Sequence, residues 1–211
     1  MIDAEKIKIN EIFTSIQGEG PSVGCPCIFV RLAGCNLSCW FYDTKYALKD
    51  GRLTGWQEVA EKLKLSSIRR YVWTGGEPSL QIKKIIEKLK KDGCDARHEI
   101  ETNGTIKFNP KLFDKVIISP KVERLRKGLV RWFNRHPNVY FKFVCKRRED
   151  FVMWKDFVEN NRLHLDKSKI YFMPEGVCND ELQKRGRWLA ELCEAHNYNF
   201  SPRLQIWLGI R

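Results

Sequence analysis

The segment Gly34–Thr44 reads GCNLSCWFYDT and contains two cysteines, Cys35 and Cys39, four positions apart. The Gly, Asn and Ser residues around them predict a loop, so these thiols are better placed to bind a ligand than to fill a core. A structural zinc site would need four nitrogen or sulfur ligands, usually in two pairs. The four histidines of the chain show no such pairing. We therefore interpret the two cysteines as ligands of a metal centre other than zinc.

Polar or glycine-rich motifs follow one predicted strand after another. They are TGGEP (74–78), ETNGT (101–105), SPK (119–121) and MPEG (173–176). In parallel α/β folds, ligands bind at the carboxyl ends of the strands, where such motifs meet. The pattern predicts one ligand site built from these motifs and the cysteine loop.

Each motif also has a simpler structural interpretation. Gly75 and Gly76, after Thr74, either let a ligand approach the backbone or form a tight turn. Glu77 could accept a hydrogen bond from an ammonium group. Glu101 is a carboxylate where a buried strand should be apolar, and a cation at 121 would suit a ligand carboxylate. The remaining candidates, which also fit ordinary turn or strand-exit sequences, are Asn103, Ser119 and Lys121.

Short β-branched or aromatic runs alternate with amphipathic helical runs along the chain. This alternation predicts parallel strands with right-handed crossovers, in an open doubly wound sheet or a full or partial (β/α) barrel. Seven strands are too few for the regular eight-stranded closure. The predicted strands are Ile28–Leu32, Tyr71–Thr74, His98–Glu101, Lys115–Ile118, Val139–Val144, Ile170–Met173 and Leu204–Trp207.

Three helices have a clear apolar face or a start signal. We expect a helix with Ile82, Ile85, Ile86 and Leu89 on one face, Ser79 as N-cap and Gly93 beyond its end; a helix from about Asn179 to Ala195 with Leu182, Leu189, Leu192 and Cys193 buried; and a helix around Val59–Leu63 after a possible capping box of Thr54 and Gln57.

Length and composition predict one globular domain spanning residues 1–211. The 211 residues are 43% hydrophobic, and no apolar run approaches the roughly 20 residues of a membrane span. The N-terminus has no apolar signal segment, so we expect a cytoplasmic protein without a membrane partner. Eight cysteines in a chain of this size are more consistent with reduced thiols and metal ligands than with a disulfide scaffold.

The net charge of +12 raises the question of nucleic-acid binding. The basic segment Lys121–Arg135 could contact RNA, with Trp132 and Phe133 as stacking residues. The same segment is also amphipathic, with Leu125, Leu129 and Trp132 able to face the sheet. We favour a solvated basic surface and do not expect direct nucleic-acid binding.

Taken together, these motifs resemble the radical S-adenosylmethionine (SAM) superfamily, whose signature is Cys-x3-Cys-x2-Cys. More closely, the chain resembles the 7-carboxy-7-deazaguanine synthase family. The resemblance covers nearly the whole chain and rests on EIFTSIQGEGPSVGCPCIFVRLAGCNLSCWFYDT, TGGEPSLQ, ETNGT, ISPK, FKFV and SPRLQIWLG. It implies an abbreviated, partial (β/α) barrel of the radical SAM type.

The resemblance also implies the cofactors. Cys35 and Cys39 would bind two irons of a [4Fe-4S] cluster, with the third ligand at position 42, and SAM would bind the open iron. The TGGE segment at Thr74–Glu77 would hold the methionine end of SAM. Thr44 would bind Mg²⁺, a cation that prefers oxygen ligands. The positions implied for the ribose and adenine side are Glu101, Asn103 and Ser119.

The implied substrate is 6-carboxy-5,6,7,8-tetrahydropterin, which the family converts to 7-carboxy-7-deazaguanine with loss of ammonia. Gln17, Glu19 and Arg31 correspond to substrate-contacting positions, and the Arg fork suits a carboxylate. Gln205 stands where many relatives carry His and can still bond a heterocycle edge. Relatives are commonly homodimers, and an electron donor such as flavodoxin or ferredoxin is implied.

Tyr42 departs from the family pattern, because it stands where the third cluster cysteine belongs. Iron-sulfur clusters are held by thiolates and occasionally by His, so a phenolate is a poor substitute. Four explanations stay open: a substitution or sequence error, replacement by Cys25 or Cys27, a catalytically disabled homologue that only binds pterin or SAM, and a labile cluster completed by Tyr42. Another radical SAM activating enzyme and an RNA-binding protein are further alternatives.

Overall fold

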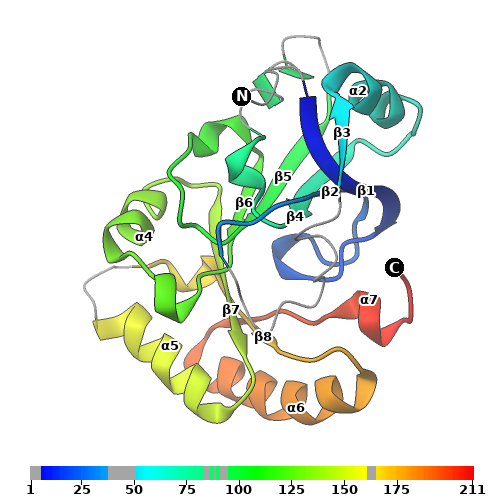
Figure 1. Ribbon diagram of the computed structural model, residues 1–211. Helices are drawn as coiled ribbons and strands as arrows, with labels where there is room; N and C mark the ends of the chain where they lie inside the picture. Colours follow the sequence, from blue (N-terminus) through cyan, green and yellow to red (C-terminus); the bar gives the residue numbers. More distant parts are fainter. Residues whose placement is uncertain (1–5, 38–50, 83–85, 88, 91–94, 161–164) are drawn as a thin grey trace. The chain divides into compact units, whose positions relative to one another are not determined.

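The computed structural model describes residues 6–37, 51–82, 86, 87, 89, 90, 95–160 and 165–211 (Figure 1). Two compact units divide the chain. The N-terminal unit comprises Met1–Ser15, Pro26–Thr102 and Ile106–Val116, and the C-terminal unit comprises Ile16–Cys25, Asn103–Thr105 and Ile117–Arg211. Whether the chain forms one radical SAM-like domain stays a prediction.

The N-terminal unit is built on strands in the order β3-β1-β2-β4-β5. β1 and β3 are antiparallel, whereas β2, β4 and β5 are parallel to one another. Their buried Ile, Val, Leu and Trp side chains form the core of this unit. The bounds are β1 Lys6–Ile16, β2 Pro26–Leu32, β3 Arg52–Gly55, α2 Trp56–Lys64, β4 Arg70–Gly75, η2 Pro78–Leu80, β5 Arg97–Thr102 and η3 Pro110–Leu112.

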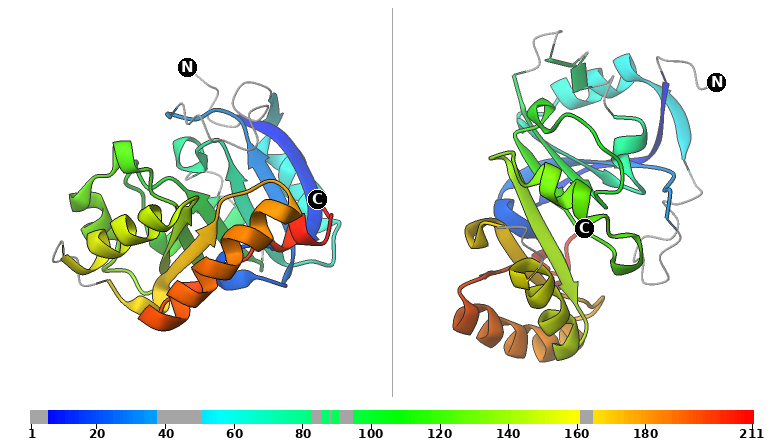
Figure 2. Two further views of the ribbon diagram at one scale, coloured as in Figure 1. Left: turned by 90° about the horizontal axis from the view of Figure 1, so that it is seen from below. Right: turned by 90° about the vertical axis from the view of Figure 1, so that its left-hand side faces the viewer.

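The C-terminal unit contains β7-β8-β9 in parallel pairing, and β6 (Lys115–Ile118) lies where the two units divide. Figures 1 and 2 show α5 and α6 beside β7 and β8. Phe143, Phe151 and Phe172 pack together between these elements. The remaining bounds are η1 Gly20–Ser22, η4 Val122–Arg124, α4 Lys127–Phe133, β7 Val139–Cys145, α5 Arg148–Asn160, η5 Lys167–Lys169, β8 Ile170–Pro174, α6 Asn179–His196, β9 Asn199–Phe200 and α7 Leu204–Trp207.

The first six predicted strands are confirmed, but the seventh is wrong. Leu204–Trp207 is the short helix α7, in which the Leu208 amide donates to the Leu204 carbonyl at 2.9 Å. Pro202 supplies no N–H for strand pairing, and Gly209, with φ +63°, follows the helix end. A short apolar run cannot distinguish strand from helix by periodicity alone.

The predicted helix faces are confirmed in part, and the predicted capping box of Thr54 and Gln57 is wrong. Ile82, Ile86 and Leu89 are buried, while Ile85 and Gly93 lie outside the described residues. Thr54 lies in β3, where its hydroxyl donates to the Arg52 carbonyl, so it does not cap α2. The Glu77 carboxyl caps η2, where it accepts from the Ser79 amide. The start of the helix that Ser79 was predicted to cap lies outside the described residues. In α6, Leu189 and Cys193 are buried, and Leu182 and Leu192 are half-buried.

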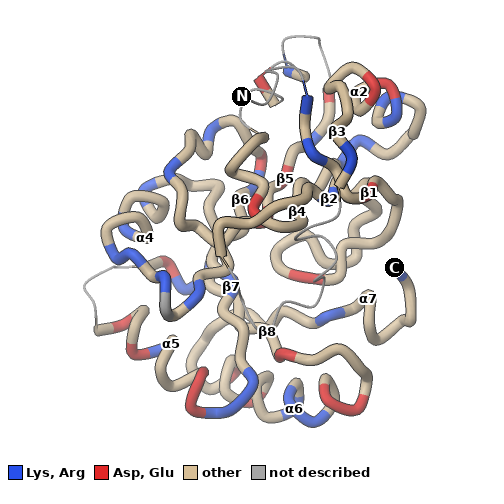
Figure 3. Tube along the Cα trace, in the orientation of Figure 1, with Lys and Arg blue, Asp and Glu red and all other residues tan. Residues whose placement is uncertain are grey.

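The basic segment 121–135 contains η4 and α4, and the blue stretches of the backbone trace in Figure 3 mark Lys and Arg positions along it. The buried residues of α4 are Val130 and Phe133, whereas Leu125, Leu129 and Trp132 are half-buried. The segment is therefore amphipathic, with a face one position removed from the one predicted. Across the described part of the chain, every helix is too short or too polar to cross a bilayer.

Candidate active site

The turn after β4 approaches the end of β2 closely enough to require glycine. Gly75 has φ +111°, and a Cβ there would lie 2.2 Å from the Leu32 carbonyl oxygen. A Cβ on Gly76 would lie 1.9 Å from the Gly34 carbonyl oxygen. The amides of Gly76 and Glu77 donate to the carbonyls of Leu32 and Gly34 at 2.9 and 2.8 Å. The glycines thus bring the predicted SAM-binding turn against the segment that leads to Cys35.

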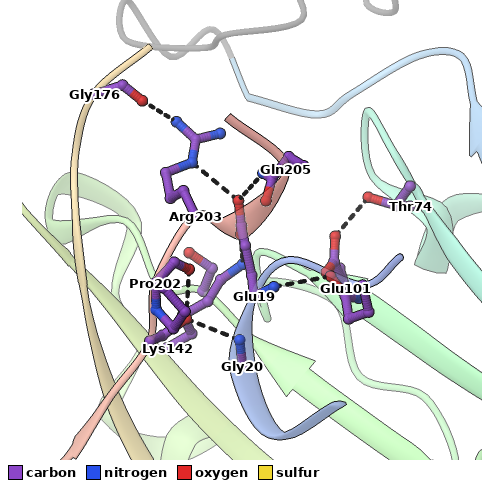
Figure 4. A network of polar contacts seen from close by, with 12 residues as sticks. Glu19, Gly20, Thr74, Glu101, Lys142, Gly176, Pro202, Arg203 and Gln205 are labelled. Carbon is purple, nitrogen blue, oxygen red and sulfur yellow. Dashed lines mark hydrogen bonds and ion pairs between the residues drawn. The ribbon is translucent and has the colours of Figure 1, made fainter. Parts of the chain in front are cut away.

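Two carboxyl groups of the N-terminal unit are held by threonines. Glu77 is fully buried, and one of its oxygens accepts from the Thr102 hydroxyl at 2.6 Å and from the Ser79 amide at 3.0 Å. Glu101 accepts from the Thr74 hydroxyl at 2.8 Å (Figure 4). Because β4 and β5 are adjacent parallel strands, their carboxyl ends place these predicted cofactor-binding residues together.

Arg31 lies on β2 in register with Thr74 on β4. Its Nε donates to a Glu11 carboxylate oxygen at 2.7 Å, and its guanidinium lies over the Phe13 ring at 5.7 Å. The side chain is 17% exposed. Arg31 is therefore a well-held, partly accessible cation, as a carboxylate-binding residue would need to be.

The cysteines differ sharply in their surroundings. Cys35 is half-buried, and its sulfur accepts from the Leu37 amide at 3.4 Å. Cys27 is fully buried beside Phe29 and donates to the Ser15 carbonyl, so the structure supports its interpretation as a core residue. Cys25 is half-buried. The predicted ligands Cys39 and Thr44, and Tyr42, lie outside the described residues. Among those that are described, no three His, Cys, Asp or Glu residues form a metal-binding group.

In the C-terminal unit, the side chains of Lys142, Arg203 and Gln205 surround the Glu19 carboxylate, and we call these four residues the Glu19 cluster (Figure 4). One carboxylate oxygen of Glu19 accepts from Arg203 Nε at 3.0 Å and from Gln205 Nε2 at 2.9 Å. The other oxygen pairs with the Lys142 ammonium. The side chains of Glu19, Lys142 and Arg203 are 12%, 7% and 10% exposed. The cluster is thus a nearly buried ion-pair network.

The charge state of Glu19 follows from this network. Burial by itself would raise the pKa of Glu19, because it disfavours the charged form. The charges of Lys142 and Arg203, with hydrogen bonds from Lys142 and Gln205, outweigh burial and hold the pKa well below its ordinary range. Glu19 is therefore a charged hydrogen-bond acceptor at neutral pH.

Two glutamines complete the surroundings of Glu19. Gln17 is buried, and its Oε1 accepts from the Glu19 amide at 3.1 Å. Gln205 Oε1 is buried and has no hydrogen-bond partner within the described part of the chain. A Cβ on Gly18 would lie 1.7 Å from this oxygen, so Gly18 leaves the space that Gln205 occupies. The structure thus brings three of the four predicted substrate-binding residues together.

The other predicted cofactor-binding residues of this unit make local contacts. The Asn103 side chain accepts from the Thr105 amide and hydroxyl at 2.9 and 2.6 Å, which is turn chemistry. Lys121 Nζ donates to the Ser119 hydroxyl at 3.2 Å. These contacts fit the simpler turn and strand-exit interpretation as well as a ligand role.

Sequence reasoning missed Lys142 and Arg203 as members of the site. A signal existed for Lys142, because VYFKFVC places one charge among buried apolar residues of β7. For Arg203, the segment that directly follows it, Leu204–Trp207, was predicted as a strand, and Arg203 itself was assigned to no element. Only the fold brings residues 19, 142 and 203 to one place.

No family model matches the chain. It is, however, similar along nearly its whole length to proteins named 7-carboxy-7-deazaguanine synthase. The protein from Hyperthermus butylicus is 33% identical over 95% of this chain and 92% of its own length. The protein from Pyrobaculum aerophilum is 31% identical over 95% and 94%.

Solved structures show the same fold. QueE from Escherichia coli matches with a TM-score of 0.73 and 24% identity over 93% of each chain. SuiB from Streptococcus suis, bound to S-adenosylmethionine, matches with a TM-score of 0.56 and 13% identity over 80% of this chain and 45% of its own. The fold is the partial (β/α) barrel of the radical SAM type, as the resemblance implied. By its identity to full-length relatives, the chain belongs to the 7-carboxy-7-deazaguanine synthase family.

Proposed function

We propose that this protein acts on 6-carboxy-5,6,7,8-tetrahydropterin and forms 7-carboxy-7-deazaguanine with release of ammonia. The Glu19 cluster is the observation that carries the proposal. A charged carboxylate and an adjacent amide, nearly buried, suit the N–H donors along the edge of a pterin. The chain is similar over almost its whole length to relatives named 7-carboxy-7-deazaguanine synthase, and this similarity supports the choice of substrate.

The predicted site residues have distinct roles in this proposal. Glu19 and Gln205 would accept hydrogen bonds from the heterocycle, and Gln17 would hold the Glu19 backbone. Arg31 would bind the substrate carboxylate, because a guanidinium presents paired donors. Thr44, as a hydroxyl ligand, would bind Mg²⁺ near the same anionic group. Substrate binding and orientation are the contributions assigned to these residues.

The fit of the chain to SAM and a [4Fe-4S] cluster is uneven. For SAM, Thr74–Glu77 form a close turn beside Gly34, and Glu101, Asn103, Ser119 and Lys121 would supply polar groups. Glu77 is already bonded to Thr102 and the Ser79 amide, so it would act by shaping the turn. For the cluster, the motif is one thiolate short, because Tyr42 replaces the third cysteine. When bound, the cluster and SAM would supply the electron and the 5′-deoxyadenosyl radical.

Tyr42 also supports a second candidate, a homologue that binds pterin or SAM without turnover. Iron and sulfide content and the reduced EPR spectrum, measured after anaerobic reconstitution with and without SAM, separate the two. The chain should be compared with Tyr42→Cys, and Cys35→Ser serves as the cluster-free control. A SAM-responsive cluster only in Tyr42→Cys would favour the disabled homologue.

The other outcomes have equally definite meanings. A SAM-responsive cluster in the unaltered chain would mean that another residue completes the ligand set, and Cys25 should then be replaced before the buried Cys27. Product formation from the pterin would establish the enzyme. If neither form holds a cluster and neither binds the pterin, the proposal is wrong.

The cellular setting is also a proposal. We infer a cytoplasmic homodimer that receives electrons from a flavodoxin- or ferredoxin-type donor and does not bind nucleic acid directly. Sedimentation velocity tests the oligomeric state. Reduction of a reconstituted cluster by purified flavodoxin tests the donor, and a salt titration with RNA tests the last statement.

A further inference from the structure

We propose that Lys142 and Arg203 are positioning residues that hold the Glu19 carboxylate in place for a ligand bearing N–H groups. The ligand part of this inference rests on the proposed function, whereas the effect on Glu19 does not. Neither residue was among the predicted site residues. Four steps support the assignment.

The first step is the placement of Lys142 on β7. Val139, Phe141, Phe143 and Cys145 are buried on one face of this strand, and Lys142 projects from the opposite face. The Lys142 side chain is nevertheless only 7% exposed. Burying an ammonium is costly unless it is paired. Its ion pair with Glu19, a residue 123 positions away, offsets that cost.

The second step is the two-sided anchoring of Arg203. Its Nε donates to Glu19, and its Nη1 donates to the Gly176 carbonyl. Gly176 is the last residue of the MPEG segment and lies two positions after the end of β8. A planar guanidinium bonded at two edges fixes the direction of approach to the carboxylate. Arg203 therefore orients Glu19 as well as neutralising its charge.

The third step is the independent attachment of the Glu19 loop. The Gly20 amide donates to the buried Ser201 hydroxyl at 2.8 Å, and the Leu204 amide donates to the Gly18 carbonyl at 3.0 Å. These bonds hold the backbone on both sides of Glu19. Replacing Lys142 should therefore change the side chain and its charge more than the position of the loop.

The fourth step is electrostatic. Within the C-terminal unit, the charged groups on Glu19 are Lys142 from β7 and Arg203 from the segment before α7, and Gln205 is neutral. Burial opposes ionisation, so Glu19 depends on these cations for its charge. A charged acceptor binds N–H groups about twice as strongly as a neutral one. Loss of either cation should weaken ligand binding most at acidic pH.

The test begins with Glu19 itself and needs no ligand. The ¹³C-labelled Glu side-chain carboxyl signals would be followed over about pH 3 to 8, with Glu19→Gln assigning the signal. Lys142→Met and Arg203→Met should each raise the titration midpoint of Glu19 far enough to fall within this pH range, whereas in the unaltered protein the signal should stay that of the charged form over most of it. Lys142→Arg should restore a low midpoint, which a purely structural role would not predict.

Lys62→Met provides the matched control. It removes an exposed ion pair with Glu58, whose charged atoms are 2.9 Å apart, in the other unit of the chain. It should leave the Glu19 signal unchanged. Circular dichroism identifies which variants keep the native fold, and the two methionine variants give independent readings. The proposal is overturned if Glu19 keeps its low midpoint in a natively folded Lys142→Met or Arg203→Met protein, or if neither variant folds while Lys142→Arg also raises the midpoint.

The second measurement is the affinity for 6-carboxypterin, a stable probe, at about pH 5 and pH 8. We expect similar affinity at both values in the unaltered protein, and a loss of about tenfold or more at pH 5 in Lys142→Met. If the midpoint moves as expected but no form binds the probe, the positioning role stands and the proposed function fails. If the probe binds equally to all variants at both pH values, the inference about the ligand is wrong.

Discussion

Protonation of His98 should make the stability of this protein depend on pH. His98 lies in β5 and is fully buried. Its Nδ1 accepts from Trp73 Nε1 at 3.1 Å, so the neutral ring carries its proton on Nε2. Nε2 is buried and has no hydrogen-bond partner within the described residues. A second proton would place a buried positive charge between Trp73 and Tyr71, whose ring lies edge-on to the imidazole at 5.5 Å.

The size of the effect follows from the pKa of His98. Burial, with a smaller contribution from Lys90, lowers the pKa from 6.5 to about 4 despite the opposing charge of Asp114. A gap of about 2.5 pH units corresponds to about 3 kcal/mol of unfolding free energy. For a domain whose total stability is about 5 to 15 kcal/mol, this is a large fraction.

The direction of the effect is fixed by which state binds the proton. Above about pH 6.5 the His98 ring is neutral in both the folded and the unfolded state, and the contribution of His98 to the unfolding free energy is fully present. Between about pH 6.5 and 4 the unfolded chain takes up a proton that the native protein does not. The unfolding free energy should fall by about 1.4 kcal/mol per pH unit in this window. Below about pH 4 both states are protonated, and His98 causes no further loss.

The assay is urea unfolding followed by tryptophan fluorescence at several pH values between about 4 and 8. His98→Asn keeps an acceptor near the Nδ1 position and removes the titration. At pH 8 the unfolding free energy of His98→Asn should be lower than that of the unaltered protein. Between about pH 6.5 and 4 it should decrease much less than that of the unaltered protein. His136→Asn is the control, because it replaces a histidine that is only half-buried. His136 follows α4, and its ring contacts the Trp132 ring. Parallel pH profiles for the unaltered protein and His98→Asn would refute the reasoning.

Two further predictions concern glycines. Gly75→Ala should lower the unfolding free energy by about 2 to 5 kcal/mol, because a Cβ at φ +111° would lie 2.2 Å from the Leu32 carbonyl oxygen. Gly128→Ala is the control in the same urea titration. It should be neutral or slightly stabilising, because a Cβ there meets nothing within 4 Å. Gly18→Ala should displace Gln205 and weaken 6-carboxypterin binding, because its Cβ would lie 1.7 Å from Gln205 Oε1. Gln205→Ala in the Gly18→Ala background should recover part of the lost thermal stability. Recovery should be incomplete, because the Gln205 backbone nitrogen would remain 2.8 Å from the new Cβ. Simple additivity of the two changes in melting temperature would contradict this packing account.

Sequence patterns predicted the buried parallel strands well, because such strands are continuous apolar runs between turn residues. They predicted the edges poorly. β3 and β9 are too short to show a periodic pattern, and the segment of β1 was used only for targeting signals and for the family resemblance. Leu204–Trp207 has the composition of a strand, but its neighbours Pro202 and Gly209 favour a helical turn.

The motifs by themselves determined the family, the glycine turn and most candidate site residues. These features depend on local chemistry: glycine where no Cβ fits, thiols in a loop, and carboxylates at strand ends. The ligand set implied for the [4Fe-4S] cluster is also decided by the sequence. Tyr42 stands where the family motif has a thiolate, whatever the conformation of the chain.

Only the tertiary structure decided how these groups are paired. It shows that the Glu77 carboxyl accepts a hydrogen bond from the Thr102 hydroxyl and that Cys27 lies in the core. It also brought Lys142 and Arg203 to Glu19, across 123 and 184 positions of the chain. The charge of a buried carboxylate depends on which cations surround it, and that is a property of distances that no local pattern contains.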